Sequence, residues 1–132
     1  MKTPIPRPTE SELSILRILW DHGPAPVRTV AEELSADRGE EVGYTTALKL
    51  LQLMHEKGLV HRDETERSHR YAAVHPPAQV RWQALKNLSD KLFGGAPAEL
   101  AMHALSHQKA SPEDLQKIRE LLDTLESQQK GE

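Results

Sequence analysis

The stretch from Gly43 to Val60 constrains the fold more than any other part of the chain. Its apolar residues recur at the i, i+3, i+4, i+7 spacing of a helix with one buried face, and they are Ala47, Leu50, Leu51 and Met54. Gly58 supplies the left-handed residue that ends such a helix, and an alternating, extended pattern follows it. The sequence therefore predicts a half-buried helix that runs directly into a β-hairpin.

The face of this helix opposite the apolar one is polar. Thr45 and Thr46 lie in the first turn, where hydroxyls cap free N–H groups and where a phosphate or a base edge can meet the positive end of the helix. Lys49 and Gln52 follow on the outer face, and Tyr44 precedes the threonines. These side chains are candidates for contact with nucleic acid. Helix capping and ordinary exposure to solvent are the alternatives that the residues leave open.

Two helical segments precede this stretch. Thr9 and Glu12 have the spacing of a capping box and predict the start of the first helix, whose apolar stripe ends at Trp20. The second helix is predicted over residues 27–35, and residues 35–43 are predicted to form a polar loop. Three helices followed by a hairpin are typical of a helix-turn-helix with a wing.

The predicted hairpin has strands at residues 59–62 and 69–74 around a polar turn at residues 63–68. A wing of this kind sets basic side chains against phosphates or in a minor groove while the helix lies in the major groove. Acidic residues in the turn partly offset the basic ones. The basic side chains of the hairpin that are candidates for DNA contact are Arg62, Arg67, His69 and Arg70.

Three more helices are predicted after the wing. The first follows Pro76, the second begins at Pro97, and the third has Ser111 as its cap with Pro112 at its first position. Their apolar stripes are more than three short helices can cover alone, so we expect a second copy of the chain to cover them; an intrachain core is the alternative. The residues expected at the dimer contact are Leu85, Leu88, Leu92, Leu115, Ile118, Leu121, Leu122 and Leu125.

The predicted fold class is therefore mainly α, with three parts along the chain. Residues 1–8 form an extended arm that is punctuated by prolines. Residues 9–75 form a winged helix-turn-helix domain of three helices and a small β-wing. Residues 76–132 form a C-terminal three-helix dimerisation region.

Composition excludes several classes of function. The chain has no cysteine, which excludes disulfides and thiolate metal sites. It has neither a signal peptide nor a membrane-spanning stretch, so we expect a cytoplasmic protein with no membrane partner. No catalytic motif or cofactor-binding loop is present, so neither an enzyme nor a cofactor is expected. The net charge of −3 means that any DNA-binding surface must be local.

One pair of histidines has the spacing of a candidate metal site. His103 and His107 have the i, i+4 spacing with which two imidazoles on a helix can share a metal ion. The chain has no cysteine to act as a third ligand, and we expect none from an acidic residue. We therefore predict no metal site.

The residues from Thr9 to Val74 carry a resemblance to a known family. The first helix ends in Ile-Leu-Trp, Tyr-Thr-Thr opens the third, Glu-Lys-Gly-Leu-Val ends it, and His-Arg-Tyr lies in the hairpin. Together these motifs resemble the penicillinase-repressor family (BlaI/MecI/CopY) of bacterial winged-helix repressors. The similarity continues through Gly94-Gly95 and the terminal helix, and so covers nearly the whole chain.

The resemblance implies a function. In that family the N-terminal winged helix binds a palindromic operator in double-stranded DNA, and a C-terminal helical arm forms the homodimer. A transcriptional repressor is therefore expected, with residues 44–52 of the third helix in the major groove and the arginines of the wing on the backbone.

Some features of the chain depart from the family pattern. Leu48 and Leu53 stand on the flanks of the third helix, where family members often carry basic or polar residues. A sensor protease cuts the β-lactam-responsive members at an Asn-Phe bond, and the matching place here is His103-Ala104. The copper-responsive members use a cysteine cluster that this chain lacks, so the upstream sensor and the inducing signal stay open. The alternative function is a winged-helix protein-interaction module that does not bind DNA.

Overall fold

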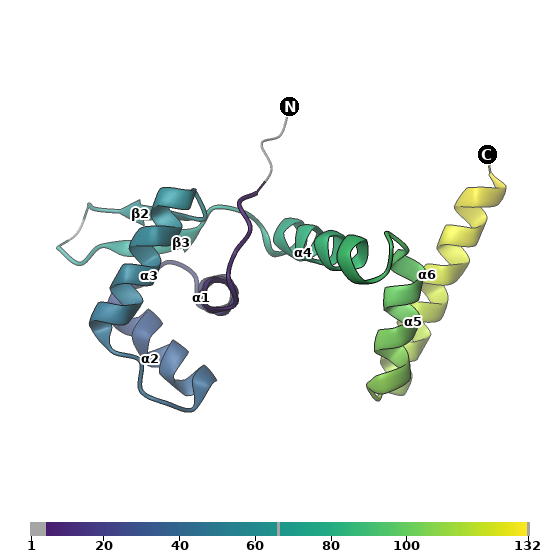
Figure 1. The fold of residues 1–132 in the computed structure, drawn as a ribbon, viewed down its shortest axis with the longest axis horizontal. Coiled ribbons are helices and arrows are strands. Elements are labelled where there is room, and N and C mark those ends of the chain that lie inside the picture. The colour runs from purple at the N-terminus through teal and green to yellow at the C-terminus, as the bar shows by residue number, and fades with distance from the viewer. Residues whose placement is uncertain (1–4, 66, 132) are drawn as a thin grey trace. The chain divides into compact units, whose positions relative to one another are not determined.

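The computed structural model of the chain describes residues 5–65 and 67–131. They form two compact units, of which one ends at Leu85 and the other begins at Lys86. The described residues comprise six helices and one small antiparallel sheet, so the predicted mainly α class is confirmed (Figure 1). The unit boundary falls within α4 (Pro77–Leu92), whereas the sequence places the domain boundary before this helix.

The first unit begins with three helices: α1 (Glu10–His22), α2 (Val27–Arg38) and α3 (Tyr44–Lys57). The predicted capping box is present at α1, since the Thr9 hydroxyl accepts from the Glu12 N–H and the Glu12 carboxylate accepts from the Thr9 N–H. Figure 1 shows α2 and α3 side by side, with the β-hairpin following α3.

The second helix is longer than predicted. It continues to Arg38 and ends at Gly39, whose φ of 71° lies in the left-handed region. Ser35, the predicted last residue, lies inside the helix, where its hydroxyl donates to the Ala31 carbonyl. The same hydroxyl accepts from the Val42 N–H at 2.8 Å and so fixes the shortened loop before α3.

A three-stranded antiparallel sheet follows the order β1 (Ala25–Pro26), β3 (Arg70–Ala73), β2 (Val60–Asp63). Gly58 ends α3 in the left-handed region with φ 82°, as predicted, and Leu59 then leads directly into the wing. β2 has the predicted length but begins one residue later than predicted, and β3 is two residues shorter than predicted. The first strand was not predicted, and it pairs with β3 through Ala25 and Tyr71.

The core of the first unit lies between the three helices and the sheet. The helices contribute their predicted apolar faces, and the sheet contributes Tyr71, which is among the largest fully buried side chains. Burial of each large apolar side chain contributes roughly 1.5 to 3 kcal/mol to folding. The α3 residues in this core are Ala47, Leu51 and Met54, while Leu50 and Leu48 are half-buried against it.

One charged side chain is buried beside this core. Glu12 is 2% exposed, and its carboxylate accepts from Lys57 Nζ at 2.8 and 3.0 Å. Burial alone would raise the pKa of Glu12, but hydrogen bonds from Lys57 and Thr9 outweigh burial, so the pKa lies below its ordinary value. The ion pair joins the start of α1 to the end of α3 and so helps to position α3.

Contacts made by Trp20 and Ile5 attach His75, just before α4, and the first part of α4 to the rest of the first unit. The Trp20 indole N–H donates to the His75 carbonyl at 3.2 Å, and the Arg81 guanidinium lies 5.7 Å from the centre of the Trp20 ring. Ile5, in the described part of the predicted arm, is buried, and its backbone N–H and carbonyl both bond to the Gln83 amide. The bonds between Ile5 and Gln83 thus join a residue before α1 to a residue after the wing.

The second unit contains the end of α4, α5 (Pro97–His107) and α6 (Pro112–Lys130). The Ser111 hydroxyl accepts from the Asp114 N–H at 3.1 Å and caps α6 as predicted. Among the described residues from Lys86 onward, Ser89 alone is buried, and no apolar side chain is. No helix in the described part of the chain is long and apolar enough to cross a membrane.

Candidate nucleic-acid interface

The outer face of α3 is the first part of the candidate interface. All five residues predicted to make contacts there are exposed, and they are Tyr44, Thr45, Thr46, Lys49 and Gln52. The N-cap of α3 is Gly43, and no side chain caps it. The described structure therefore gives the two threonines no capping role, and the helix presents a polar face that the core does not use.

The flanking leucines of α3 differ from each other. Leu48, predicted to stand on the exposed flank, is half-buried and packs against the core. Leu53 is 42% exposed, as predicted. Only Leu53 therefore adds substantial apolar surface to the face of α3.

The wing forms the second part of the interface. Arg62 lies in β2 opposite Tyr71 of β3, and its Nη2 atom lies 2.6 Å from Glu64 Oε1. A hydrogen bond with the Tyr71 hydroxyl, and then the charge of Glu64, raise the pKa of Arg62 above its ordinary value. The guanidinium is therefore held in place and stays charged.

The turn of the wing is ordered by Asp63. Its Oδ1 atom accepts from the Thr65 N–H at 3.0 Å and from the Thr65 hydroxyl at 2.8 Å. The backbone bond and then the hydroxyl bond lower the pKa of the Asp63 carboxyl. Arg67 and His69 follow this turn in the chain.

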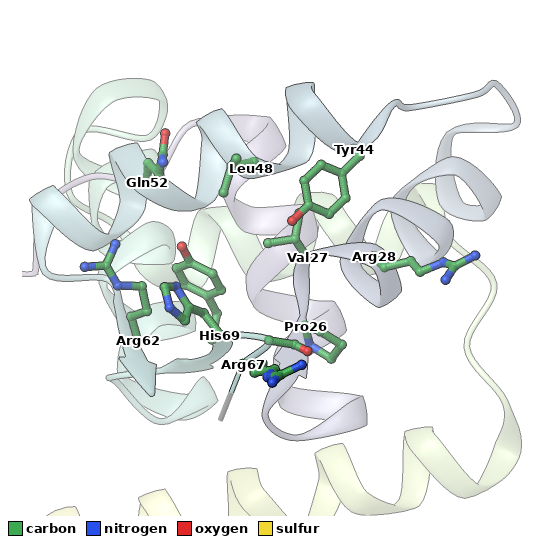
Figure 2. A pocket seen from close by; sticks show the side chains of 11 residues that line it. Pro26, Val27, Arg28, Tyr44, Leu48, Gln52, Arg62, Arg67 and His69 are labelled. Carbon is green, nitrogen blue, oxygen red and sulfur yellow. The ribbon is translucent and has the colours of Figure 1, made fainter. Parts of the chain in front are cut away.

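A hollow lies between α3, the wing and the start of α2, as Figure 2 shows. Below we call it the wing hollow. It brings together five of the predicted contact residues, and these are Tyr44, Gln52, Arg62, Arg67 and His69. Its other lining residues are Pro26, Val27, Arg28, Leu48, Ser68 and Tyr71. The remaining predicted residues, Thr45, Thr46, Lys49 and Arg70, do not line it.

The wing hollow is electrostatically unlike the chain as a whole. Of the described residues, three arginines and one histidine line it and no acidic residue does, although the chain has a net charge of −3. A second hollow, between α1 and α2, contains Arg17 and His22 together with three acidic residues, Asp21, Glu33 and Asp37. Positive charge is therefore concentrated where α3 meets the wing, as a local DNA-binding surface requires.

Arg28 is the charged lining residue that the sequence did not single out. It lies in the first turn of α2, and its side chain is directed away from the wing in Figure 2. Its Nε atom lies 3.6 Å from a carboxylate oxygen of Glu32. The position of an exposed arginine at the start of the second helix was the available signal, but only the pairing of β1 with β3 brings this region beside the wing.

The candidate metal-binding histidines, His103 and His107, both lie on α5. The rings of His103 and His107 have centroids 4.6 Å apart, and the Phe93 ring lies 5.9 Å from that of His103. Among the residues that the structure describes, no group of three potential ligands could hold a metal ion.

The residues predicted for the dimer contact are solvent-exposed in the single chain. Leu92 is 70% exposed, Ile118 is half-buried, and the other six are exposed. They form apolar stripes on α4 and α6 that no other part of the described chain covers.

The family model of the penicillinase repressor matches residues 8–124. The chain belongs to the penicillinase repressor family. The family resemblance in the sequence is thereby confirmed.

Curated relatives agree with this assignment. The transcriptional regulator BlaI from two strains of Mycobacterium tuberculosis is 42% identical over 65 residues, which are 48% of this chain and 46% of the relative. The match thus spans about half the length of these curated relatives.

Two solved structures resemble the chain. The complex structure of hsRosR-S4 has a TM-score of 0.52 at 22% identity over 74% of this chain and 86% of that one, and it supports the fold alone. The solution structure of the DNA binding domain of the repressor BlaI has a TM-score of 0.49 at 20% identity over 59% of this chain and 93% of that one.

Proposed function

We propose that this chain is a DNA-binding transcriptional repressor that binds a palindromic operator as a homodimer. The observation that carries the proposal is the wing hollow, which concentrates positive charge beside the exposed polar face of α3 in an acidic chain. Binding to DNA depends on neutralising backbone phosphates, and specificity depends on hydrogen bonds to base edges. In this proposal the wing hollow supplies the positive charge for the phosphates, and α3 supplies the hydrogen bonds to base edges. Membership of the penicillinase repressor family supports the same class.

In this proposal α3 lies in the major groove. Lys49 and Gln52 are long enough to donate to base edges, lysine to guanine and glutamine to adenine. Thr45 and Thr46 contact phosphates or thymine methyl groups, and Tyr44 lies at the start of the helix. The wing then holds the DNA backbone through Arg62, Arg67, His69 and Arg70.

The proposed homodimer forms through the second unit. Its apolar stripes on α4 and α6 are exposed in the single chain, and a second copy would cover them. Two recognition helices related by two-fold symmetry would then read two half-sites one helical turn apart. Such a repressor acts in the cytoplasm, where bacterial promoter DNA lies, and needs neither a cofactor nor a catalytic step.

The alternative is a winged-helix module that binds a protein. The exposed Leu53 and the negative net charge favour it. The half-buried Leu48 does not, because it packs on the core of its own domain. This alternative predicts no salt-dependent affinity for DNA.

A selection from random duplex DNA tests the two functions. The purified chain is incubated with the duplex pool at two salt concentrations, and the bound DNA is sequenced. A two-fold symmetric motif that survives the higher salt supports the repressor. A folded, dimeric protein that enriches no motif contradicts it and favours the protein-interaction module.

Substitution of Lys49 tests the position of α3. We expect Lys49→Ala to weaken binding to the selected motif by about 1 to 3 kcal/mol and to relax specificity at one base pair. Lys109→Ala, in the loop between α5 and α6, is the matched control and should leave the affinity unchanged. Equal affinities of wild type and Lys49→Ala would show that α3 is not placed in the major groove as proposed.

A further inference from the structure

We propose that the wing hollow is a binding site for one phosphate group. Its donors come from the wing and from the start of α3: the guanidinium groups of Arg62 and Arg67, the imidazole of His69, and the hydroxyl of Tyr44. A guanidinium presents a planar fork of N–H donors that matches two phosphate oxygens. Among the residues that the structure describes, no carboxylate lines the hollow, although Glu64 beside it pairs with Arg62.

The surroundings of these donors strengthen their attraction for an anion. Val27 and Tyr71 are buried, and Leu48 is half-buried, so part of the hollow is walled by apolar, water-poor structure. An ion pair beside such a wall is weakened less by solvent than one on an open surface. The second hollow of this unit has an arginine but also three acidic residues, and it therefore does not attract an anion in the same way.

Arg62 and Arg67 differ in what an anion must displace. Arg62 is held by Glu64 at 2.6 Å, whereas Arg67 makes no ion pair with any residue that the structure describes. A bound phosphate would therefore accept hydrogen bonds from Arg67 without displacing another partner, but it would compete with Glu64 for Arg62. Removal of the Glu64 charge should accordingly tighten phosphate binding, which is a gain that a misfolded variant could not show.

Two sources can supply the phosphate. One is the DNA backbone, and for this source the inference rests on the proposed function: a strand phosphate in the hollow would fix the register of α3 in the groove. The other is a free small molecule that carries a phosphate. Because both would use the same donors, such a molecule would displace DNA, and the repressor could be released without a cut in its chain.

The experiment titrates the full-length chain with inorganic phosphate and, separately, with sodium chloride at matched ionic strength, followed by NMR of backbone amides and arginine side chains. We expect phosphate alone to shift the resonances of Tyr44, Arg67 and His69 saturably. Shifts that are spread over all arginines, or that chloride reproduces, would show only a diffuse ion atmosphere and would overturn the proposal.

Variants sharpen this titration. Arg67→Gln should weaken phosphate binding roughly tenfold, the loss expected for one charge-assisted hydrogen bond. Glu64→Gln should tighten it. Arg17→Gln, in the second hollow, is the matched arginine control and should change nothing. Phosphate affinity that is equal in all three variants would contradict the assignment of the site to the wing hollow.

A competition assay separates the two sources. At constant ionic strength, phosphate should weaken binding of the selected duplex to the wild type more than to Arg67→Gln. If phosphate binds in the hollow but the chain binds no duplex, the phosphate site stands and the proposed function fails. If the duplex binds and phosphate neither shifts the hollow nor competes, the repressor stands and the phosphate site fails.

Discussion

The two units of this chain treat similar apolar patterns in opposite ways. In the first unit, the stripes of α1, α2 and α3 face one another and the sheet, and every buried apolar residue of the described chain lies at or before Val80. In the second, the leucines of α6 recur with the same helical spacing but stay exposed. The helical spacing of apolar residues therefore predicts which face of a helix must be buried. It does not predict whether another element of the same chain or a second chain buries that face.

This difference has an energetic consequence. The first unit gains the free energy of apolar burial within one chain, so its stability should not depend on protein concentration. The second unit has no such core among its described residues, so its order should be linked to association and should rise with concentration. Four predictions test the contrast.

The largest effect is expected for Leu121→Asp on α6. It removes an apolar side chain from the proposed contact and places a charge there, and two-fold symmetry doubles the loss. We expect association to weaken by about 3 to 6 kcal/mol, more than a hundredfold, with poor binding of a full palindrome. Sedimentation equilibrium measures the change. Ser127→Asp, on the opposite side of α6, should leave the dimer intact, and a Leu121→Asp protein that remains dimeric would remove this stripe from the interface.

The second prediction concerns the core of the first unit. Leu51 is fully buried in α3, so Leu51→Ala should leave a cavity and lower the free energy of unfolding by about 2 to 5 kcal/mol. Urea unfolding at two protein concentrations should show the same loss at both. Leu53→Ala, two residues along the same helix but exposed, should change stability by no more than about 0.5 kcal/mol. A loss that depended on concentration would contradict the separation of the two units.

The elements of the fold that could be predicted were those with a local cause. The capping box at Thr9, the left-handed Gly58 and the cap at Ser111 each depend on residues no more than a few positions apart, and each is present as predicted. The strand at Ala25 could not be predicted, because two residues carry no periodicity and its partner is Tyr71. Glu12 and Lys57 are likewise far apart in the sequence, so their ion pair could not be predicted from a local pattern.

The candidate site was predictable to the same extent. The helical spacing of α3 was enough to place Lys49 and Gln52 on the exposed face. The grouping of residues in the wing hollow depends on how the hairpin folds back towards α3 and on β1, which brings Arg28 close. Leu48 was misplaced because helical spacing puts it on the flank of α3, whereas in the folded domain it packs against the core.

The third prediction uses the pH dependence of the Glu12–Lys57 pair. The pKa of Glu12 is lowered in the folded protein, so its contribution to stability is present above the ordinary value of 4.5 and is lost as the pH falls through the folded pKa. Lys57→Met leaves the buried carboxylate without its main partner. We expect a loss of about 1 to 2 kcal/mol at pH 7, reduced because Lys57 is partly exposed.

The test is how the loss of stability caused by Lys57→Met changes with pH. Without Lys57, burial should raise the pKa of Glu12, and protonation then relieves the unpaired charge. The stability difference between wild type and Lys57→Met should therefore shrink as the pH falls from 7 to about 4. Lys49→Met, which alters a lysine on the exposed face of the same helix, should show no such trend. A constant difference across this range would mean that the ion pair does not stabilise the charged form of Glu12.

The smallest effects, about 1 kcal/mol each, are expected for the two helix caps. Thr9→Ala removes the cap of α1, while Ser111→Ala removes the cap of α6, and each deletes one hydrogen bond to a helix N–H. The local chemistry is the same, but the units differ. Thr9→Ala should lower the stability of the first unit equally at all protein concentrations, whereas Ser111→Ala should act mainly on the association equilibrium, because α6 lacks an intrachain core. Thermal melts at several concentrations measure both. Identical concentration dependence in the two variants would mean that the second unit is ordered without a partner, and the proposed dimer would lose its strongest physical argument.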